Sequence, residues 1–347
     1  MKRFNLAAVT LAGMAIVAGV QSASARDLTV VGFGGTLQDA FRKAYFEPYA
    51  AATGSKLVED TTNGGIAKQK AMVETKNVTW DVVQMEEDEV TLACAEGLLL
   101  NVDWAKLPSY SKADPTMFSE CGAGAIVWSE VLTYDAAKIK DGPKNWADFW
   151  NVAKWPGKRG LRKTAKLTLE LALMADGVPG SDVYRVLATK EGQDRAFKKL
   201  DELKPNVQWW ESGAQPLEWL ASGAVAMTAA YNGRIANARK EGRDFPIIWG
   251  DSLYSIDYWA IIAGSSNEKQ ALEFVDFALS TSPQKAFAEA IPYGIANKEA
   301  MAALPADLLS QLPSAPDNLK GAVKINSEFW TDHGQELNER FSAWVAR

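Results

Sequence analysis

The 347-residue chain has one histidine, two cysteines and no excess of basic residues. A Ser-His-Asp triad would therefore depend on His333 alone, and zinc sites built from four cysteines, or from two cysteines and two histidines, are excluded. The 43 acidic residues outnumber the 37 basic ones, which argues against a nucleic-acid-binding protein with a basic face. Redox chemistry based on a Cys-x-x-Cys pair is excluded because no such pair is present.

Apolar and aromatic residues are, in contrast, plentiful. The hydrophobic content of 47% over this length can bury a substantial core, and the length suggests about two domains. The chain also holds 13 tryptophans and 9 tyrosines, which are many for a plain scaffold. Most should pack in the core or on the surface, and some are candidates for a binding site, where aromatic faces attract ammonium groups.

Residues 1–25 have the pattern of a secretory signal peptide. Lys2 and Arg3 give a basic start, residues 4–20 are uncharged and mostly apolar, and 23–25 (ASA) form a small-residue cleavage signal before Arg26. The alternative is a membrane anchor, but the apolar run is short for a bilayer span and no second such run follows. We therefore predict export to a bacterial periplasm.

Cys94 and Cys121 form an even pair in a compartment that is predicted to be oxidising. Such a pair indicates a structural disulfide, with two buried free thiols as the alternative. The bridge would close a loop of 27 residues and stabilise the fold by roughly 3 kcal/mol in the chain-entropy model.

Strand-like and helix-like segments alternate along the chain. The predicted strands are 27–31, 55–60, 80–85, 158–163, 224–231 and 255–263. The predicted helices are 37–54, one within 61–76, 88–97, 167–177, one or more within 181–203, 216–223 and 267–279. This alternation is typical of parallel βαβ units in an α/β fold. Because no linker-like segment is present, we expect two domains joined by crossing strands.

Two polar segments lie at predicted strand ends. The turn 32–36 (GFGGT) resembles a phosphate-binding loop, but Leu37 leaves the glycine motif incomplete and no Gly-Lys-Ser/Thr follows. The segment is either a plain tight turn or a place where backbone approaches a polar ligand. In the acidic run that follows the strand 80–85, Asp88 and Glu89 suit the first turn of a helix. Glu86, at the strand end, is the candidate for a ligand site.

A second group of candidates lies in the later half of the chain. Asp257 interrupts the apolar strand 255–263, and a charge there is costly unless it has a partner. The alternatives are a structural ion pair or capped turn and a cation-binding role. Tyr231 and Arg234 follow the strand 224–231, again at a strand end.

Six segments of the sequence resemble the extracellular solute-binding proteins of polyamine-type ABC importers. They are residues 34–54, 80–99, 211–234, 252–266, 291–301 and 315–330. The resemblance covers nearly the whole chain after residue 25 and implies a type II periplasmic-binding-protein fold, with two α/β lobes, crossing hinge strands and a ligand in the cleft. It places lobe 1 at 26–124 plus 245–296 and lobe 2 at 125–244 plus 297–347.

The same resemblance implies a ligand. Polyamine-binding members hold two ammonium groups with two acidic positions, one of which is matched by Asp257, whereas the other is Arg234. An arginine would repel a second ammonium and can grip a carboxylate. This pair resembles the site of 4-aminobutyrate-binding members, with Arg234 for the carboxylate and Asp257 for the amine. Further residues are placed by family position and strand ends: Thr36, Glu86, Trp210, Tyr231 and Tyr293.

We therefore expect a monomeric periplasmic receptor for a small ω-amino acid such as 4-aminobutyrate, which delivers its ligand to an ABC permease and its ATPase at the inner membrane. We expect no catalysis, cofactor, metal or nucleic acid. A receptor for putrescine, spermidine or another cationic amine is the main alternative, and a secreted hydrolase or lyase is a third. Other ω-amino acids, betaines and opine-like compounds also fit one arginine and one aspartate. Arg234 could instead pair with Asp257 itself.

Overall fold

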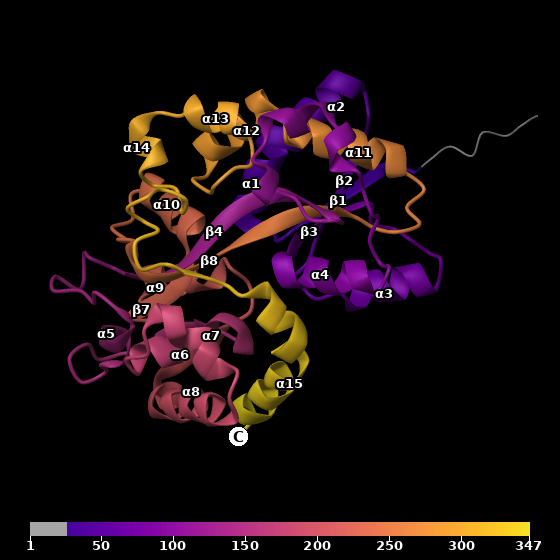
Figure 1. Ribbon diagram of the computed structural model, residues 1–347. Coiled ribbons are helices and arrows are strands. Elements are labelled where there is room, and N and C mark those ends of the chain that lie inside the picture. The colour runs from indigo at the N-terminus through magenta and orange to yellow at the C-terminus, as the bar shows by residue number, and fades with distance from the viewer. Residues whose placement is uncertain (1–25) are drawn as a thin grey trace, which may run out of the picture.

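The structure is a computed structural model that describes residues 26–347, so the predicted signal peptide lies outside the described residues. Its strands form one nine-stranded sheet in the order β2-β1-β3-β8-β4-β7-β5-β6, with β9 beside β8, and Figure 1 shows the long strands β4 and β8 at the middle of the molecule. The strands are β1 (Leu28–Gly32), β2 (Leu57–Thr61), β3 (Val82–Glu86), β4 (Gly122–Tyr134), β5 (Arg159–Arg162), β6 (Val207–Trp210), β7 (Met227–Tyr231), β8 (Ile248–Ile261) and β9 (Val323–Lys324).

Helices pack around this sheet. They are α1 (Gly35–Phe41), α2 (Glu47–Thr53), α3 (Ala67–Glu74), α4 (Glu87–Ala95), α5 (Trp146–Trp150), α6 (Ala165–Ala175), α7 (Val183–Leu187), α8 (Lys190–Leu203), α9 (Gln215–Ser222), α10 (Asn232–Lys240), α11 (Glu268–Ala278), α12 (Thr281–Ala290), α13 (Lys298–Ala302), α14 (Ala306–Leu309) and α15 (Ser327–Val345). No helix within residues 26–347 is both long and apolar enough to cross a lipid bilayer. The mixed α/β class agrees with the sequence-based prediction.

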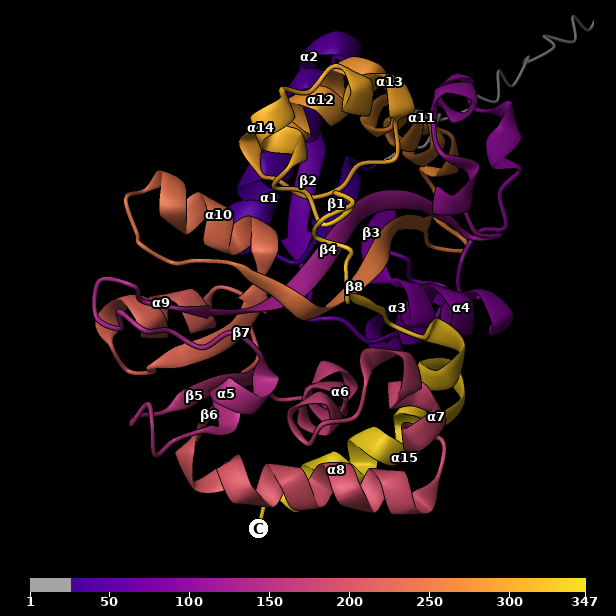
Figure 2. The same cartoon turned by 60° about the vertical axis from the view of Figure 1, so that its left-hand side comes forward.

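The sheet has two parallel halves that two long strands join (Figure 2). In the first half β1 pairs in parallel with β2 and β3, and in the second half β5 pairs in parallel with β6 and β7. The antiparallel pair β4 and β8 runs through both halves, because β8 also pairs with β3 and β4 also pairs with β7. The predicted crossing strands are therefore present.

Two predicted elements differ from the structure in their bounds, and the strands β4, β6 and β9 were not predicted. The helix predicted for 37–54 is divided into α1 and α2 by a π-helical turn at Arg42–Phe46, directly before Pro48, which has no N–H to donate to the preceding turn. The strand 122–134 was not predicted, because its buried glycines and Glu130 hide its apolar pattern. Strand β8 begins at residue 248 and not at 255, and β6 was also missed.

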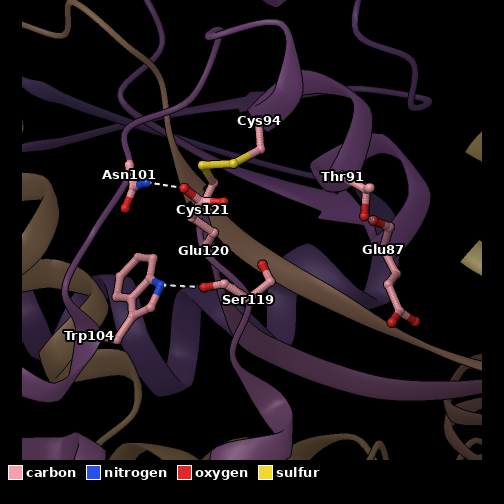
Figure 3. Close-up of a disulfide and its surroundings, with 8 residues drawn as sticks. All are labelled: Glu87, Thr91, Cys94, Asn101, Trp104, Ser119, Glu120 and Cys121. Atoms are coloured by element: carbon pink, nitrogen blue, oxygen red, sulfur yellow. Dashed lines mark hydrogen bonds between the residues drawn. A yellow bond between two sulfur atoms is a disulfide. The ribbon is translucent and has the colours of Figure 1, made fainter. Parts of the chain in front are cut away.

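The disulfide that the sequence predicts is present and joins Cys94 in α4 to Cys121, directly before β4 (Figure 3). The two Cα atoms are 5.8 Å apart and 27 residues separate them in the chain. Nearby, the Trp104 indole donates a hydrogen bond of 2.8 Å to the Ser119 carbonyl. These contacts fix the segment that leads from α4 into the first crossing strand.

Candidate functional site

One cavity between the two halves of the sheet brings together six of the seven predicted ligand-binding residues: Glu86, Trp210, Tyr231, Arg234, Asp257 and Tyr293. Strand ends place several of them. Glu86, Trp210 and Tyr231 are the last residues of β3, β6 and β7. Asp257 is the register partner of Glu86 on the neighbouring strand β8. Thr36 lies outside this cavity and lines an adjacent groove with Arg234.

Asp257 lies on the floor of the cavity. Only 3% of the residue is exposed, and its carboxylate accepts hydrogen bonds from the Gln84 amide at 2.7 Å and the Trp128 indole at 2.5 Å. Burial raises the pKa of Asp257 well above its usual range, and the nearby Glu86 raises it further. Because neither hydrogen-bond donor is a cation, a positively charged ligand group would be the counter-charge of Asp257 and would favour its ionised form.

Arg234 lies on the opposite wall, in the first turn of α10. The guanidinium donates hydrogen bonds to two backbone carbonyls of the β1–α1 loop, Gly34 at 3.1 Å and Phe33 at 3.3 Å, while its Nε is buried without a hydrogen-bond partner. The predicted alternative, an ion pair between Arg234 and Asp257, is not present. Arg234 therefore brings a positive charge to the cavity that no carboxylate within residues 26–347 neutralises.

Glycines allow Arg234 to lie this close to the backbone of the first half. A Cβ on Gly35 would be 2.5 Å from Arg234 Nη1, and a Cβ on Gly213 would be 2.9 Å from its Nε. Gly34 and Gly35 also have positive φ angles of 65° and 60°, which favour glycine. The glycines of the predicted GFGGT turn thus let the backbone lie close to the Arg234 guanidinium.

The start of α10 is fixed by a buried asparagine. The Asn232 side chain accepts a hydrogen bond of 3.0 Å from the Ser129 amide of β4 and donates one of 2.8 Å to the Pro292 carbonyl. Gly233 makes room for the Tyr293 ring, since a Cβ there would lie 2.5 Å from it. These two residues hold Arg234 and Tyr293 in place around the cavity.

Glu86 is the one predicted acidic candidate that already has cationic partners. Its carboxylate forms ion pairs with Arg162, at 3.0 Å, and with Lys166. Burial alone would raise the pKa of Glu86, but Lys166 and Arg162 hold it well below its usual range. Glu86 therefore stays ionised and neutralised by the chain itself.

Aromatic side chains cover the space between the charged groups. The Tyr231 ring meets Trp128 and Trp210 edge to face, with centroids 5.2 Å and 5.7 Å apart. Trp128 was missed in the sequence because the strand that carries it was not predicted. Arg162 was also missed, although its place at the end of the predicted strand 158–163 was a usable signal. Of the later tryptophans, Trp210 lines the cavity, whereas Trp259 is fully buried in the core.

The charges of the cavity can be paired off. Five charged side chains line it: Glu86, Arg162, Glu211, Arg234 and Asp257. Glu86 pairs with Arg162, and Glu211 pairs with Lys163 at 2.7 Å near the surface. One positive group, Arg234, and one negative group, Asp257, remain. A ligand with one carboxylate and one ammonium group complements this remainder.

The single histidine, His333, does not line the cavity. Within residues 26–347, no group of three His, Cys, Asp or Glu side chains is placed to hold a metal ion. His333 lies in the middle of α15, where its ring packs on Phe329 with centroids 4.8 Å apart. The residues that line the cavity can bind and orient a ligand.

Comparisons with known proteins agree with this geometry. The family model for bacterial extracellular solute-binding proteins matches residues 44–316. The gamma-aminobutyric acid-binding protein of Pseudomonas aeruginosa is 51% identical over 339 residues, which cover 98% of this chain and 96% of that protein. A solved GABA receptor structure is 32% identical with a TM-score of 0.81, and the match covers 92% of this chain and 98% of that one. The spermidine/putrescine-binding periplasmic protein of Escherichia coli is 25% identical over 78% of this chain and 79% of that protein.

Proposed function

Because the chain belongs to the family of bacterial extracellular solute-binding proteins, we propose that it is the periplasmic receptor of an ABC importer for 4-aminobutyrate or a close ω-amino acid. In this function the protein binds its ligand without changing it. It then delivers the ligand to the permease, whose ATPase drives uptake. The protein acts as a monomer that is exported by the signal peptide predicted at residues 1–25.

The observation that carries this proposal is the pair of opposite charges left unneutralised in one cavity. Arg234 binds the ligand carboxylate through its Nε, which is buried and has no hydrogen-bond partner in the chain. The carbonyls of Phe33 and Gly34 accept hydrogen bonds from Nη2 and so orient the guanidinium group. Asp257 binds the ammonium group, held in place by Gln84 and Trp128. Both charges are almost fully buried, so each contact with the ligand is strong.

The aromatic walls suit the methylene chain that links the two poles. Trp128, Trp210 and Tyr231 pack against one another around the space between Arg234 and Asp257. These rings exclude water and bury the apolar part of the ligand. An ω-amino acid with separated poles uses all three features, whereas a hydrophobic ligand would leave both charges unpaired.

The comparisons support the choice of ligand. The Pseudomonas aeruginosa protein, which shares 51% of its residues with this chain, is named for gamma-aminobutyric acid. The polyamine-binding relative is half as similar. A diamine would place its second ammonium group against Arg234, where two positive charges would repel each other. We therefore make polyamine binding an outcome of the test and not a second proposal.

Isothermal titration calorimetry of the ligand-stripped protein tests the proposal. The panel contains 4-aminobutyrate, 5-aminovalerate, β-alanine, a betaine, an α-amino acid, putrescine and spermidine. We expect 4-aminobutyrate or a neighbour of one methylene more or less to bind most tightly, at least 100-fold more tightly than putrescine. Binding of putrescine or spermidine without binding of any ω-amino acid would contradict the proposal.

A further inference from the structure

A side cavity adjoins the ligand cavity at its acidic end. The two share Asn63, Glu86 and Arg162 as lining residues, and the side cavity continues toward Asp88 and Lys166. The elements around it are the loop after β2, the start of α4, the start of α6 and the middle of α15. A ligand longer than 4-aminobutyrate could therefore extend past the Glu86 carboxylate into the side cavity.

The carboxylates at this end already hold an ammonium group that belongs to the chain. Lys166 Nζ lies 2.7 Å and 2.8 Å from the two carboxylate oxygens of Asp88 and also forms an ion pair with Glu86. Arg162 holds the other oxygen of Glu86 at 3.0 Å. Only 11% of each cationic side chain is exposed, so these pairs are shielded from bulk water.

The backbone keeps Lys166 in this position. Lys166 has a ψ angle of 138° and Leu167 a φ angle of 75°, so regular helical geometry in α6 begins only after these two residues. A leucine in the left-handed region is unusual, and here its side chain is fully buried. The Thr164 hydroxyl also donates a hydrogen bond of 2.8 Å to the Lys166 carbonyl. The backbone conformation therefore positions the Lys166 side chain beside the carboxylates of Glu86 and Asp88.

We propose that Lys166 is a specificity-determining residue that occupies, from within the chain, a further place beside Glu86 and Asp88, distinct from the Arg234 position, where an amine of a polyamine would bind. Its ammonium group neutralises Glu86 and Asp88 together with Arg162. Within the ligand cavity, Asp257 is then the carboxylate without a cationic partner that can receive a ligand amine, whereas Glu89 of the side cavity accepts a hydrogen bond from the Gly65 amide. The receptor is thereby restricted to ligands with one amine.

This inference rests on the proposed function, because it explains how the same cavity rejects a second positive charge. Glu86 and Asp257 are neighbours across β3 and β8. With Lys166 in place, a second ligand ammonium group that lies near Glu86 meets the positive charges of Lys166 and Arg162. Like charges repel strongly in a buried site. Without the lysine charge, Asp88 and Glu86 share one cation and carry an excess negative charge.

The test is the substitution Lys166→Met, which keeps the unbranched side chain except for its last atom and removes its charge. Calorimetry on ligand-stripped protein measures the association constants for 4-aminobutyrate, putrescine and spermidine. We expect the ratio of polyamine to 4-aminobutyrate association constants to rise at least tenfold over the unsubstituted protein. The matched control is Lys158→Met, whose lysine is exposed, donates a hydrogen bond of 2.7 Å to the Pro205 carbonyl and lines neither cavity, so this change should leave the ratio unchanged.

A folded Lys166→Met protein whose ratio equals that of the control would overturn the proposal. If the unsubstituted protein does not bind 4-aminobutyrate, the proposed function fails instead, and the two failures are therefore distinguishable. Should Lys166→Met not fold, Lys166→Ala is refolded with spermidine or with sodium chloride of equal ionic strength. Better refolding with spermidine supports the proposal, and equal yields contradict it.

Discussion

Arg234 and Asp257 are two buried residues of opposite charge, and neither forms an ion pair with the other residues that the structure describes. Buried charges of this kind are costly unless a partner arrives, and here the ligand supplies both partners. The ligand-binding function and the unusual electrostatics of the cavity therefore have one explanation.

Asp257→Asn should weaken 4-aminobutyrate binding by about 2–5 kcal/mol, because the ammonium group loses its only buried counter-charge. The amide keeps the size of the side chain, so packing is little disturbed. Calorimetry measures the loss, with the exposed Asp317→Asn as control. An affinity that matches the control would remove Asp257 from the site.

Glu130 is a second buried carboxyl group, next to Tyr231 in the sheet register, and both of its oxygens lack hydrogen-bond partners. Burial raises the pKa of Glu130 to about 8, although Arg162 opposes the shift. Below the unfolded-state pKa, a carboxyl group whose folded-state pKa is raised does not change the free energy of unfolding through ionisation. As the pH rises from the unfolded-state pKa to the folded-state pKa, the same group lowers the free energy of unfolding.

Glu130→Gln should therefore stabilise the protein at pH 9 by a few kcal/mol relative to the unsubstituted protein and change little at pH 4. Urea unfolding at both pH values measures the difference, and Glu336→Gln, at an exposed position of α15, is the control. If the free energy of unfolding depended on pH equally in both variants, Glu130 would not be the source of the lost stability at high pH.

The sequence alone was enough to nominate most residues of the candidate site, because strand ends and family position both point to them. Trp128 and Arg162 escaped notice for different reasons. Trp128 donates to Asp257 from a strand that the apolar pattern did not reveal, and Arg162 acts through a contact with Glu86, 76 residues away in the chain. The sequence therefore carries no signal for Trp128, whereas for Arg162 it indicates the strand end but not the contact with Glu86.

At the scale of elements, β4 and β8 decide where the site lies. They contribute Trp128 and Asp257 to the cavity and connect the two parallel halves. The sequence predicted that strands cross between domains, and it located most of the short parallel strands. It placed the start of β8 seven residues too late, because Gly250 and Asp251 look like a turn. Tertiary pairing with β4 overrides that local signal.

The Cys94–Cys121 bridge fixes the entry to β4 and should matter for stability more than for binding. Replacing both cysteines with serine should lower the free energy of unfolding by roughly 3 kcal/mol, since the unfolded chain regains the entropy of a 27-residue loop. Urea unfolding measures the change, and calorimetry should find 4-aminobutyrate affinity unaltered. Equal stability of the variant and the oxidised protein would contradict this role.

At the scale of the molecule, three sets of polar contacts link the two halves across the cavity. Arg162 and Lys166 of the second half hold Glu86 and Asp88 of the first, and Arg234 reaches the Gly34 carbonyl. A ligand that binds Arg234 and Asp257 adds a further link across the same space. Ligand binding should therefore favour the arrangement in which the halves are closed together.

The lobe boundaries predicted from the family resemblance remain a prediction. The continuous sheet shows why they are hard to read from the sequence, because each long strand belongs to both halves. Composition offers no linker to mark a boundary, and the chain passes between the halves more than once. The whole molecule is better described by its two crossing strands than by two consecutive domains.

The most direct test of the central claim is a crystal structure of the protein with 4-aminobutyrate. The ligand carboxylate should lie within hydrogen-bonding distance of the Arg234 guanidinium, and the ligand ammonium group within hydrogen-bonding distance of the Asp257 carboxylate. The methylene chain should then lie against Trp128, Trp210 and Tyr231. A ligand bound in the reverse orientation, or held by other residues, would contradict the account.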